Sequence, residues 1–138
     1  MNIRPYRHTD LAEVIALWQA CGLTREWNDP QRDIERKLTV HPELFLIGTV
    51  DEGIVATAMV GYEGHRGWVN YLGVLPDARG LSYGRAMMIE AERLLTERGC
   101  PKLNLQIRSS NEKVIAFYKK LGYGIDEVVS MGKRLIKD

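Results

Sequence analysis

Residues 74–88, with the sequence VLPDARGLSYGRAMM, hold the residue types best suited to binding an anion. An apolar run ends and a helical pattern begins in this stretch, around Gly80 and Gly84. The first amides of a helix lack partners within the helix, and the helix dipole adds about half a positive charge there. Glycines let a phosphate approach the backbone closely, and Arg79 and Arg85 can add charge-assisted hydrogen bonds. The pattern therefore predicts an anion-binding turn at a helix start.

The same stretch can also be a plain strand-to-helix turn. Any such turn can carry two glycines, and Ser82 is a good N-cap whose hydroxyl can satisfy amides of its own helix. The stretch lacks the Gly-Lys-Ser/Thr of a P-loop and the complete GxGxxG of a dinucleotide-binding fold. Spacing alone leaves the anion site and the plain turn equally open.

Four helices are predicted from apolar residues at helical spacing, with capping residues at the ends. They run from Thr9 to Gly22, from Asp29 to about Thr39, from the turn to Gly99, and from Ser109 to Gly122. Ser109 and Glu112 form a capping box at the start of the last helix. Each helix carries one apolar face, so each is expected to pack against a sheet.

Strands are predicted where apolar residues alternate or run continuously. They fall at 2–7, at three antiparallel positions within 43–76, at 102–108, and at one or two positions within 123–136. A strand thus precedes the anion-binding turn, and a helix and a further strand follow it. The turn then lies at the carboxyl end of a strand and the amino end of a helix.

Composition limits the classes of function. The 138 residues, 45% of them hydrophobic, fit one compact domain over 1–138. A net charge of +1 argues against nucleic-acid and membrane partners. The N-terminus lacks a signal-peptide pattern and no run of 18 apolar residues occurs, which predicts a cytoplasmic location. Cys21 and Cys100 have no CxxC or neighbouring histidine pair, so we expect reduced thiols, no metal site and no covalent cysteine chemistry.

Two motifs resemble those of the GNAT superfamily of N-acetyltransferases. The first, V-x-P-x-x-R-G-x-x-x-G, covers residues 74–84, and the second, N-x-x-V-x-x-F-Y-x-x-L-G-Y, covers residues 111–123. More narrowly, REWNDP and SMGKRLI are similar to the bacterial YpeA-type acetyltransferases. With the order of elements, the resemblance covers nearly the whole chain. It implies an α+β fold with a central, mostly antiparallel mixed sheet of six or seven strands, flanked by about four helices.

The resemblance implies direct transfer of an acetyl group from acetyl-CoA to a primary amine, without a metal. In the family, consecutive amides of the turn grip the CoA pyrophosphate. Ser82 stands where the family pattern has glycine, and a positive φ there would strain serine by roughly 1 kcal/mol or more. The residues implied to bind acetyl-CoA are Leu72, Gly73, Val74, Arg79, Gly80, Leu81, Ser82, Tyr83, Gly84, Arg85 and Asn111.

Acetyl transfer needs a donor that stabilises the oxygen of the tetrahedral intermediate and a proton source for the departing thiolate. The resemblance implies Tyr118 as the acid, since a phenol has a proton to give at neutral pH. Tyr118 also shares an apolar stripe with Val114 and Phe117, so it can simply be a packing residue. For the oxygen-stabilising donor, the resemblance implies a backbone amide near 72–74, a stretch that can equally be an ordinary paired strand.

The sequence does not assign a general base. Many family members carry a glutamate two positions before the leucine of the strand that precedes the turn, but this chain has Asn70, which cannot take a proton. Glu63, His65 and Asp29 are the remaining candidates. Their plainer roles are a surface charge, a solvated turn residue and a helix cap.

The resemblance places the connection between the first two helices over the acetyl group. The residues expected to line the acceptor site are Trp27, Asn28, Asp29, Glu63 and Tyr71, with Arg25 nearby. A tryptophan beside an acid can shelter a cationic amine, whereas Arg25 would suit an acceptor that carries a carboxylate. Trp27 can equally cover the edge of a small core.

Two other classes of function stay open. Ser82 and Asn70 are compatible with a catalytically weak module that binds acyl-CoA or another protein while keeping the fold. A ligand-independent protein-binding domain would use Trp27 and Trp68 as exposed anchors. If the chain is an enzyme, its expected partners are acetyl-CoA and an amine acceptor, which can be a small molecule or a peptide. A strand near the C-terminus would allow a homodimer.

Overall fold

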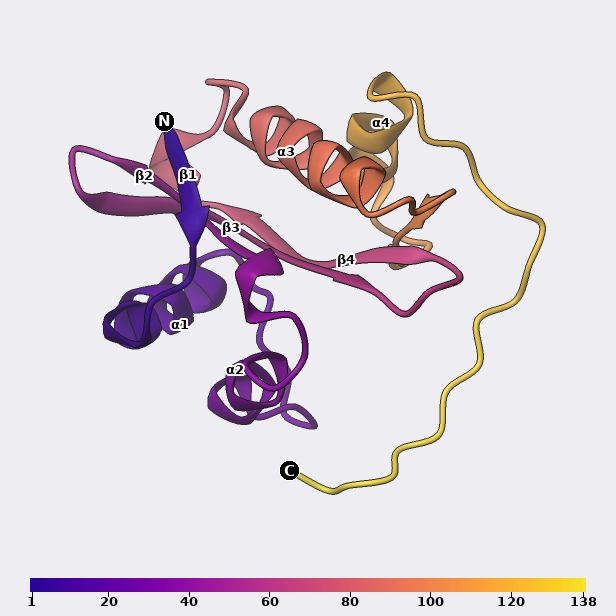
Figure 1. Cartoon of the computed structure of the whole chain (residues 1–138), viewed down its shortest axis with the longest axis horizontal. Coiled ribbons are helices and arrows are strands. Elements are labelled where there is room, and N and C mark those ends of the chain that lie inside the picture. The colour runs from indigo at the N-terminus through magenta and orange to yellow at the C-terminus, as the bar shows by residue number, and fades with distance from the viewer. The chain divides into compact units, whose positions relative to one another are not determined.

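The structure, a computed structural model, describes residues 1–138 and divides into two compact units, Met1–Leu105 and Gln106–Asp138 (Figure 1). The second unit has one regular element, α4 (Glu112–Lys120). The first unit contains, in chain order, β1 (Asn2–Pro5), α1 (Leu11–Ala20), α2 (Pro30–Lys37), β2 (Phe45–Val50), β3 (Gly53–Tyr62), β4 (Gly67–Val74), α3 (Tyr83–Glu97) and β5 (Leu103–Asn104). That residues 1–138 form a single domain stays a prediction.

The five strands of the first unit form one sheet in the order β1-β2-β3-β4-β5. The first four strands pair antiparallel, and β5 pairs parallel with β4. Helices α1 and α2 cover one face of this sheet and α3 covers the other (Figure 1). The predicted α+β fold, with a mostly antiparallel mixed sheet and four helices in the chain, is confirmed.

The predicted count of six or seven strands is wrong, because the sheet has five. Residues 123–136 form no strand, and β5 is much shorter than the predicted 102–108. Strand propensity becomes a strand only where the backbone pairs with a neighbour, and the second unit contains no strand to pair with. The apolar residues of this segment are exposed: Ile125, Val128, Val129, Met131, Leu135 and Ile136.

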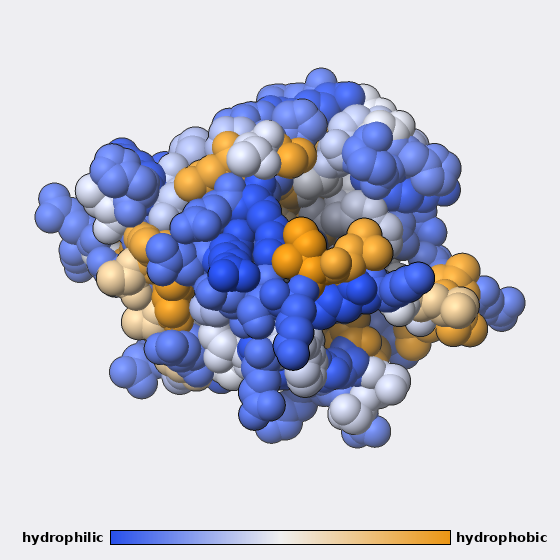
Figure 2. Space-filling model, turned by 90° about the horizontal axis from the view of Figure 1, so that it is seen from below, coloured by the Kyte–Doolittle hydropathy of each residue, from blue (hydrophilic) through white to orange (hydrophobic).

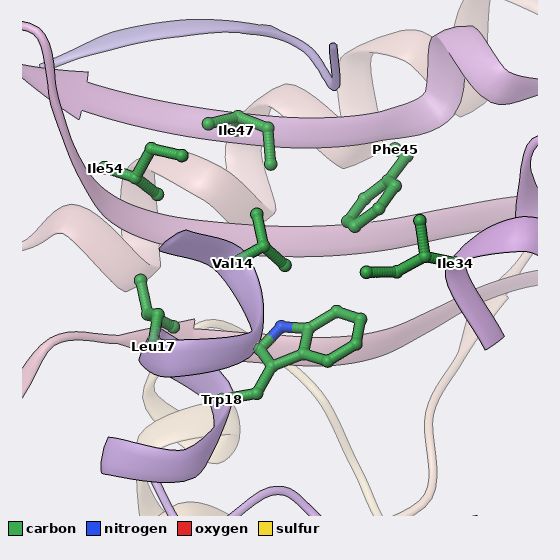
Figure 3. Packing of buried hydrophobic residues seen from close by; sticks show 7 residues of the cluster. All are labelled: Val14, Leu17, Trp18, Ile34, Phe45, Ile47 and Ile54. Atoms are coloured by element: carbon green, nitrogen blue, oxygen red, sulfur yellow. The ribbon is translucent and has the colours of Figure 1, made fainter. Parts of the chain in front are cut away.

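The core between α1, α2 and the sheet is built around Trp18 (Figure 3). Helical spacing in α1 turns one apolar face toward the sheet, as predicted. The indole N–H of Trp18 donates to Thr57 Oγ1 at 3.0 Å, which satisfies the one polar group of this buried ring. Seven side chains fill the cluster: Val14, Leu17 and Trp18 from α1, Ile34 from α2, Phe45 and Ile47 from β2, and Ile54 from β3.

An ion pair ties β1 to the turn that precedes α1. The guanidinium of Arg4 donates to both carboxylate oxygens of Asp10, at 2.7 and 2.9 Å, and the amide of Arg7 donates to the same carboxylate at 2.8 Å. The side chains of Arg4 and Asp10 are 17% and 9% exposed. The hydrogen bond from Arg4 holds the pKa of Asp10 below its usual value.

Seen from the side of α1 and α2, the surface is largely hydrophilic, with hydrophobic residues in separate patches (Figure 2). None of the helices has both the length and the apolar character needed to cross a membrane. No cluster of three or more histidine, cysteine, aspartate or glutamate side chains is arranged to hold a metal ion.

Candidate active site

The turn after β4 joins a strand end to a helix start, as the sequence predicted. β4 ends at Val74, a single 3-10 turn spans Pro76–Ala78, and α3 begins at Tyr83. Gly80 has a φ of 81°, which glycine adopts without strain, and a Cβ at this position would meet no atom within 4 Å. Glycine is therefore favoured at position 80 by the positive φ of the backbone and not by a lack of room for a side chain.

Ser82 is the N-cap residue of α3, but its side chain makes no capping hydrogen bond. Its backbone is left-handed, with φ 63° and ψ 22°, whereas a capping serine normally has an extended backbone. The alternative in which the Ser82 hydroxyl occupies amides of its own helix is therefore wrong. The left-handed backbone strains Ser82 by about 1–2 kcal/mol. The amides of the first helical residues, Tyr83, Gly84 and Arg85, have no partner within the helix.

Arg79 folds back onto the end of β4. Its Nε donates to the carbonyl of Val74 at 3.2 Å, and the thiol of Cys21 donates to the same carbonyl at 3.2 Å. A guanidinium has five N–H donors, so this bond leaves others for an anion. Arg79 and Arg85 are both exposed. The turn thus combines free helix amides with two accessible cations.

A bulge interrupts the centre of β4. Two residues, Tyr71 and Leu72, lie opposite the single β3 residue Ala58. Tyr71 has a φ of 51°, a left-handed conformation that costs a bulky residue about 1–3 kcal/mol. Backbone groups at a bulge leave the ladder. The bulge therefore includes Leu72, the first residue of the stretch 72–74 in which the family resemblance implies an oxygen-stabilising amide.

Three contacts hold Tyr71 in this conformation. Its hydroxyl donates to Asp33 Oδ2 at 2.6 Å. Its ring stacks on Trp18, with centroids 3.8 Å apart and planes 11° apart. Its carbonyl accepts a hydrogen bond from Thr57 Oγ1 at 2.8 Å. A hydrogen bond to a carboxylate contributes about 1.5–3 kcal/mol, which is comparable to the strain.

The connection between α1 and α2 is held largely by its own polar groups. Asp29 caps α2, since its Oδ1 accepts from two amides of that helix at 2.9 and 3.3 Å. Arg25 donates to two carbonyls within the connection, and its own carbonyl accepts from the amide of Asn28 at 3.1 Å. Trp27 is 51% exposed. The capping role of Asp29 is confirmed, and the role of Trp27 at the core edge or in the acceptor site stays a prediction.

Glu63 closes the hairpin between β3 and β4. Its carboxylate accepts from the amides of His65 and Arg66 and from the indole of Trp68. The hydrogen bond from the Arg66 amide is the largest cause that lowers the pKa of Glu63, which makes it a weaker base. Tyr71 lies farther along β4, about 13 Å from the start of that strand at ~3.3 Å per residue. The structure therefore does not bring Glu63 beside Tyr71, and Trp68 is a hairpin brace.

In the second unit, Asn111 is the N-cap of α4, and its side chain accepts from the amide of Val114 at 3.4 Å. The predicted helix start at Ser109, with a capping box to Glu112, is wrong, because α4 begins at Glu112. Asparagine caps a helix as well as serine does. Asn111, which directly precedes Glu112, therefore caps α4 in place of Ser109.

Tyr118 of α4 is buried, with 7% of its surface exposed. Its ring makes edge-to-face contacts with Phe117 and Tyr123, at centroid distances of 5.0 and 5.7 Å. Burial raises the pKa of the Tyr118 phenol to about 12, so the hydroxyl keeps its proton at neutral pH. Tyr118 therefore packs against its neighbours as one of the two predictions has it, and its role as the acid stays a prediction.

A model of the acetyltransferase (GNAT) family matches residues 11–123. The chain belongs to this family. It is 50% identical over 138 residues to acetyltransferase YE1169 of Yersinia enterocolitica, across 100% of this chain and 98% of that protein. The structure resembles that of Ard1 from Thermoplasma volcanium, with a TM-score of 0.79 and 26% identity over 91% of this chain and 83% of Ard1. It also resembles AAC(6')-Iy, solved with a bisubstrate analogue that contains CoA, with a TM-score of 0.77 and 18% identity over 96% and 97% of the two chains.

Sequence reasoning did not identify the three residues that hold Tyr71 in this GNAT-family protein. Trp18 lies on the apolar face of α1 and Thr57 lies within an apolar strand, so neither carries a signal of its own. Asp33 lies within α2, in a polar run with no spacing relation to Tyr71, so it carries no such signal either.

Proposed function

We propose that the chain transfers an acetyl group from acetyl-CoA directly to a primary amine. The observation that carries this proposal is the turn between β4 and α3, where the Ser82 side chain leaves the first helix amides uncapped. Such amides bind phosphate oxygens, and the CoA pyrophosphate is a fitting anion. The residues proposed to hold it are Arg79, Gly80, Leu81, Ser82, Tyr83, Gly84 and Arg85, with Asn111 as a further acetyl-CoA contact.

The pantetheine arm would lie along β4. This strand pairs with β5 only at Gly67 and Trp68, so no strand pairs with the same edge of β4 farther along. Main-chain groups of Leu72 and Gly73 and the amide of Val74 are proposed to serve the arm, since the Val74 carbonyl already accepts from Arg79 and Cys21. The thioester would then lie at the bulge.

In the transfer, the acceptor nitrogen uses its lone pair to form a bond to the thioester carbon. The carbonyl oxygen gains the negative charge, and the backbone amide near Leu72 is proposed to stabilise it by a hydrogen bond. As the oxygen returns its electron pair, the carbon–sulfur bond breaks and the CoA thiolate leaves. The nitrogen loses one proton and the thiolate gains one, so charge balances.

Tyr118 is proposed as the proton donor to the thiolate. Its pKa of about 12 keeps the phenol protonated at neutral pH, but also makes it a weaker acid than an ordinary tyrosine. The proposal therefore requires the proton lost by the acceptor nitrogen to return to the tyrosine oxygen. The phenol then acts as a relay, and no charge remains on it after a turnover.

The acceptor site is proposed to be lined by Trp27, Asn28, Asp29 and Tyr71. Trp27 is exposed and offers an aromatic face to a cationic amine, while Asp29, two residues on, adds negative charge although its Oδ1 caps α2 and its Oδ2 lies 3.8 Å from Arg32 Nε. Glu63 fits this site less well, since three hydrogen bonds occupy it in the hairpin. The YpeA-type subgroup stays a prediction from sequence.

Titration calorimetry with acetyl-CoA tests the proposal before any acceptor is known. ATP is the control for unspecific phosphate binding, and desulfo-CoA reports what the thioester adds. We expect micromolar binding that is selective for acetyl-CoA over ATP, followed by release of the CoA thiol with members of a primary-amine panel. No binding at millimolar acetyl-CoA would contradict the proposal.

A second candidate function is an acyl-CoA-binding module with weak catalysis. It is favoured by Asn70, which is exposed on β4 and cannot act as a base, and by the bracing of Glu63 in the hairpin. This candidate predicts acetyl-CoA binding without release of the thiol in the presence of any amine of the panel. A turnover that depends on Tyr118 would exclude it.

A further inference from the structure

Tyr71 is the one non-glycine residue with a positive φ that lies inside a strand. The other four lie in turns or before a helix: His41, Asp51, Glu52 and Ser82. In a turn, a left-handed residue changes the direction of the chain. Inside β4 it instead moves the backbone of Tyr71 and Leu72 out of the ladder with β3. The conformation of Tyr71 therefore sets the position of the bulge amides.

Asp33 of α2 fixes the far end of the Tyr71 side chain. The Tyr71 hydroxyl donates to Asp33 Oδ2 at 2.6 Å, and Arg36 donates to Asp33 Oδ1 at 3.1 Å. Both carboxylate oxygens thus have a defined partner, which fixes the orientation of the carboxylate. The ring and the carbonyl of Tyr71 are held separately, by Trp18 and Thr57. Removing the carboxylate would loosen Tyr71 without removing these two contacts.

We propose that Asp33 is a positioning residue for acetyl transfer, which acts by holding Tyr71 so that the bulge amide points at the oxygen of the reacting thioester. This inference rests on the proposed function. Asp33 touches no reacting atom. Its effect passes through the phenol of Tyr71 and the strained backbone to the amide near Leu72.

The proposal separates the rate of transfer from the binding of acetyl-CoA. The turn that would hold the pyrophosphate lies beyond the end of β4, and Asp33 makes no contact with it. Loss of the carboxylate should therefore leave acetyl-CoA affinity intact and lower the rate at saturating acetyl-CoA. A role in general stability would instead lower the rate in proportion to the folded fraction.

The test compares three variants of the full chain. Asp33→Ala removes the hydrogen-bond acceptor, and Asp33→Asn retains a carbonyl oxygen that can accept from the Tyr71 hydroxyl. Glu13→Ala is the matched control, since Glu13 Oε2 accepts from the amide of Ile54 at 2.8 Å and so also ties a helix to the sheet. The readouts are amide chemical shifts of residues 71–73 without ligand, acetyl-CoA affinity by calorimetry, and thiol release with hydroxylamine as the probe amine, after subtraction of the release that hydroxylamine causes without protein.

We expect Asp33→Ala to shift the amide signals of residues 71–73 and to lower the rate by at least about tenfold, with acetyl-CoA affinity within about twofold of wild type. Asp33→Asn should recover most of the rate, and Glu13→Ala should change none of the three readouts. Unchanged amide signals, or equal rate losses in Asp33→Ala and Glu13→Ala, would overturn the proposal. Shifted signals with an unchanged rate would overturn its catalytic part. If wild type binds acetyl-CoA but releases no thiol, the proposed function fails, and the amide signals alone decide whether Asp33 holds the bulge.

Discussion

Gly67 and Gly73 both belong to β4 but face opposite sides of the sheet. A Cβ on Gly67 would lie 2.7 Å from Leu95 of α3, whereas a Cβ on Gly73 would lie 3.1 Å from Leu17 of α1. Residues separated by an even number of positions share a face on a regular strand. The bulge at Tyr71 lies between the two glycines and reverses the facing. One strand thereby packs against α3 at its start and against α1 at its end.

The two glycines should respond differently to alanine. At Gly67 the new Cβ would lie within 3.0 Å of two side chains, at 2.7 and 2.9 Å, while at Gly73 the closest distances are 3.0 and 3.1 Å. We expect Gly67→Ala to lower the free energy of unfolding by about 1–3 kcal/mol and Gly73→Ala to lower it less. Urea unfolding measures both. Gly124→Ala is the control, because its Cβ would meet nothing within 4 Å, and a loss at 73 as large as the loss at 67 would contradict the expected order.

Ser82→Gly should stabilise the protein. Glycine adopts the left-handed backbone of this position without the strain of about 1–2 kcal/mol that serine carries, although its greater freedom in the unfolded chain offsets part of the gain. The expected rise in the free energy of unfolding is up to about 1 kcal/mol, with acetyl-CoA affinity unchanged or higher. Ser82→Ala keeps the strain and removes only a hydroxyl that makes no cap bond, so it should be close to neutral. A loss of acetyl-CoA affinity of about tenfold in either variant would mean that the hydroxyl binds the ligand directly.

Tyr118→Phe should lower the rate of acetyl transfer at least about tenfold, as expected for loss of a proton donor, and leave acetyl-CoA affinity nearly unchanged. The pKa of the phenol is about 12, so the wild-type rate should show no loss from ionisation of Tyr118 until the pH nears that value. Steady-state rates from neutral to alkaline pH check both points. Tyr123→Phe, which keeps the ring packed against Tyr118, is the control. An unchanged rate in Tyr118→Phe would leave this residue with packing alone.

The ion pair between Arg4 and Asp10 should make stability depend on pH in the acid range. The hydrogen bond from Arg4 lowers the folded-state pKa of Asp10, so its contribution is complete above the unfolded value of about 3.9 and is lost as the pH falls through the folded value. Asp10→Asn should cost about 3 kcal/mol at pH 7, since the partner charge stays largely buried.

Urea unfolding of both proteins between pH 7 and acid pH tests this sign. The difference between wild type and Asp10→Asn should shrink once the pH is below about 4. The exposed pair of Arg93 and Glu90 supplies the control, and Glu90→Gln should cost less than about 1 kcal/mol at any pH. A difference that stays constant down to acid pH would show that Asp10 acts through its shape and not its charge.

The sequence predicts well what depends on period and caps. The apolar spacing of Val14, Leu17 and Trp18 predicts the buried face of α1, and Asp29 with Pro30 predicts the start of α2. The apolar residues of 123–136 predict one or two strands that do not form, because a strand depends on a neighbouring ladder that local sequence does not encode. Near α4, two suitable caps stand close together, and only the geometry selects Asn111.

The site was predictable where it is continuous in sequence and not where it is assembled from distant segments. The turn around Gly80 could be located from its motif, but the φ of Ser82 could not, because serine is compatible with both signs. The partners of Tyr71 come from three other elements. No spacing rule links Asp33 or Thr57 to Tyr71, since strand pairing places Thr57 near Tyr71 and only the packing of α2 on the sheet brings Asp33 to it.

The short pairing of β4 with β5 makes β4 an interior strand at its first two residues and an edge strand beyond them. Open edges invite association with extended segments of other chains, and proteins guard them with interruptions and prolines. This edge has both, since it is broken at Tyr71 and followed closely by Pro76. The strained residue that shapes the proposed catalytic amide therefore also limits how long a foreign strand could run along it. One irregularity would thus shorten the edge on which a foreign strand can pair and leave main-chain groups available for a ligand.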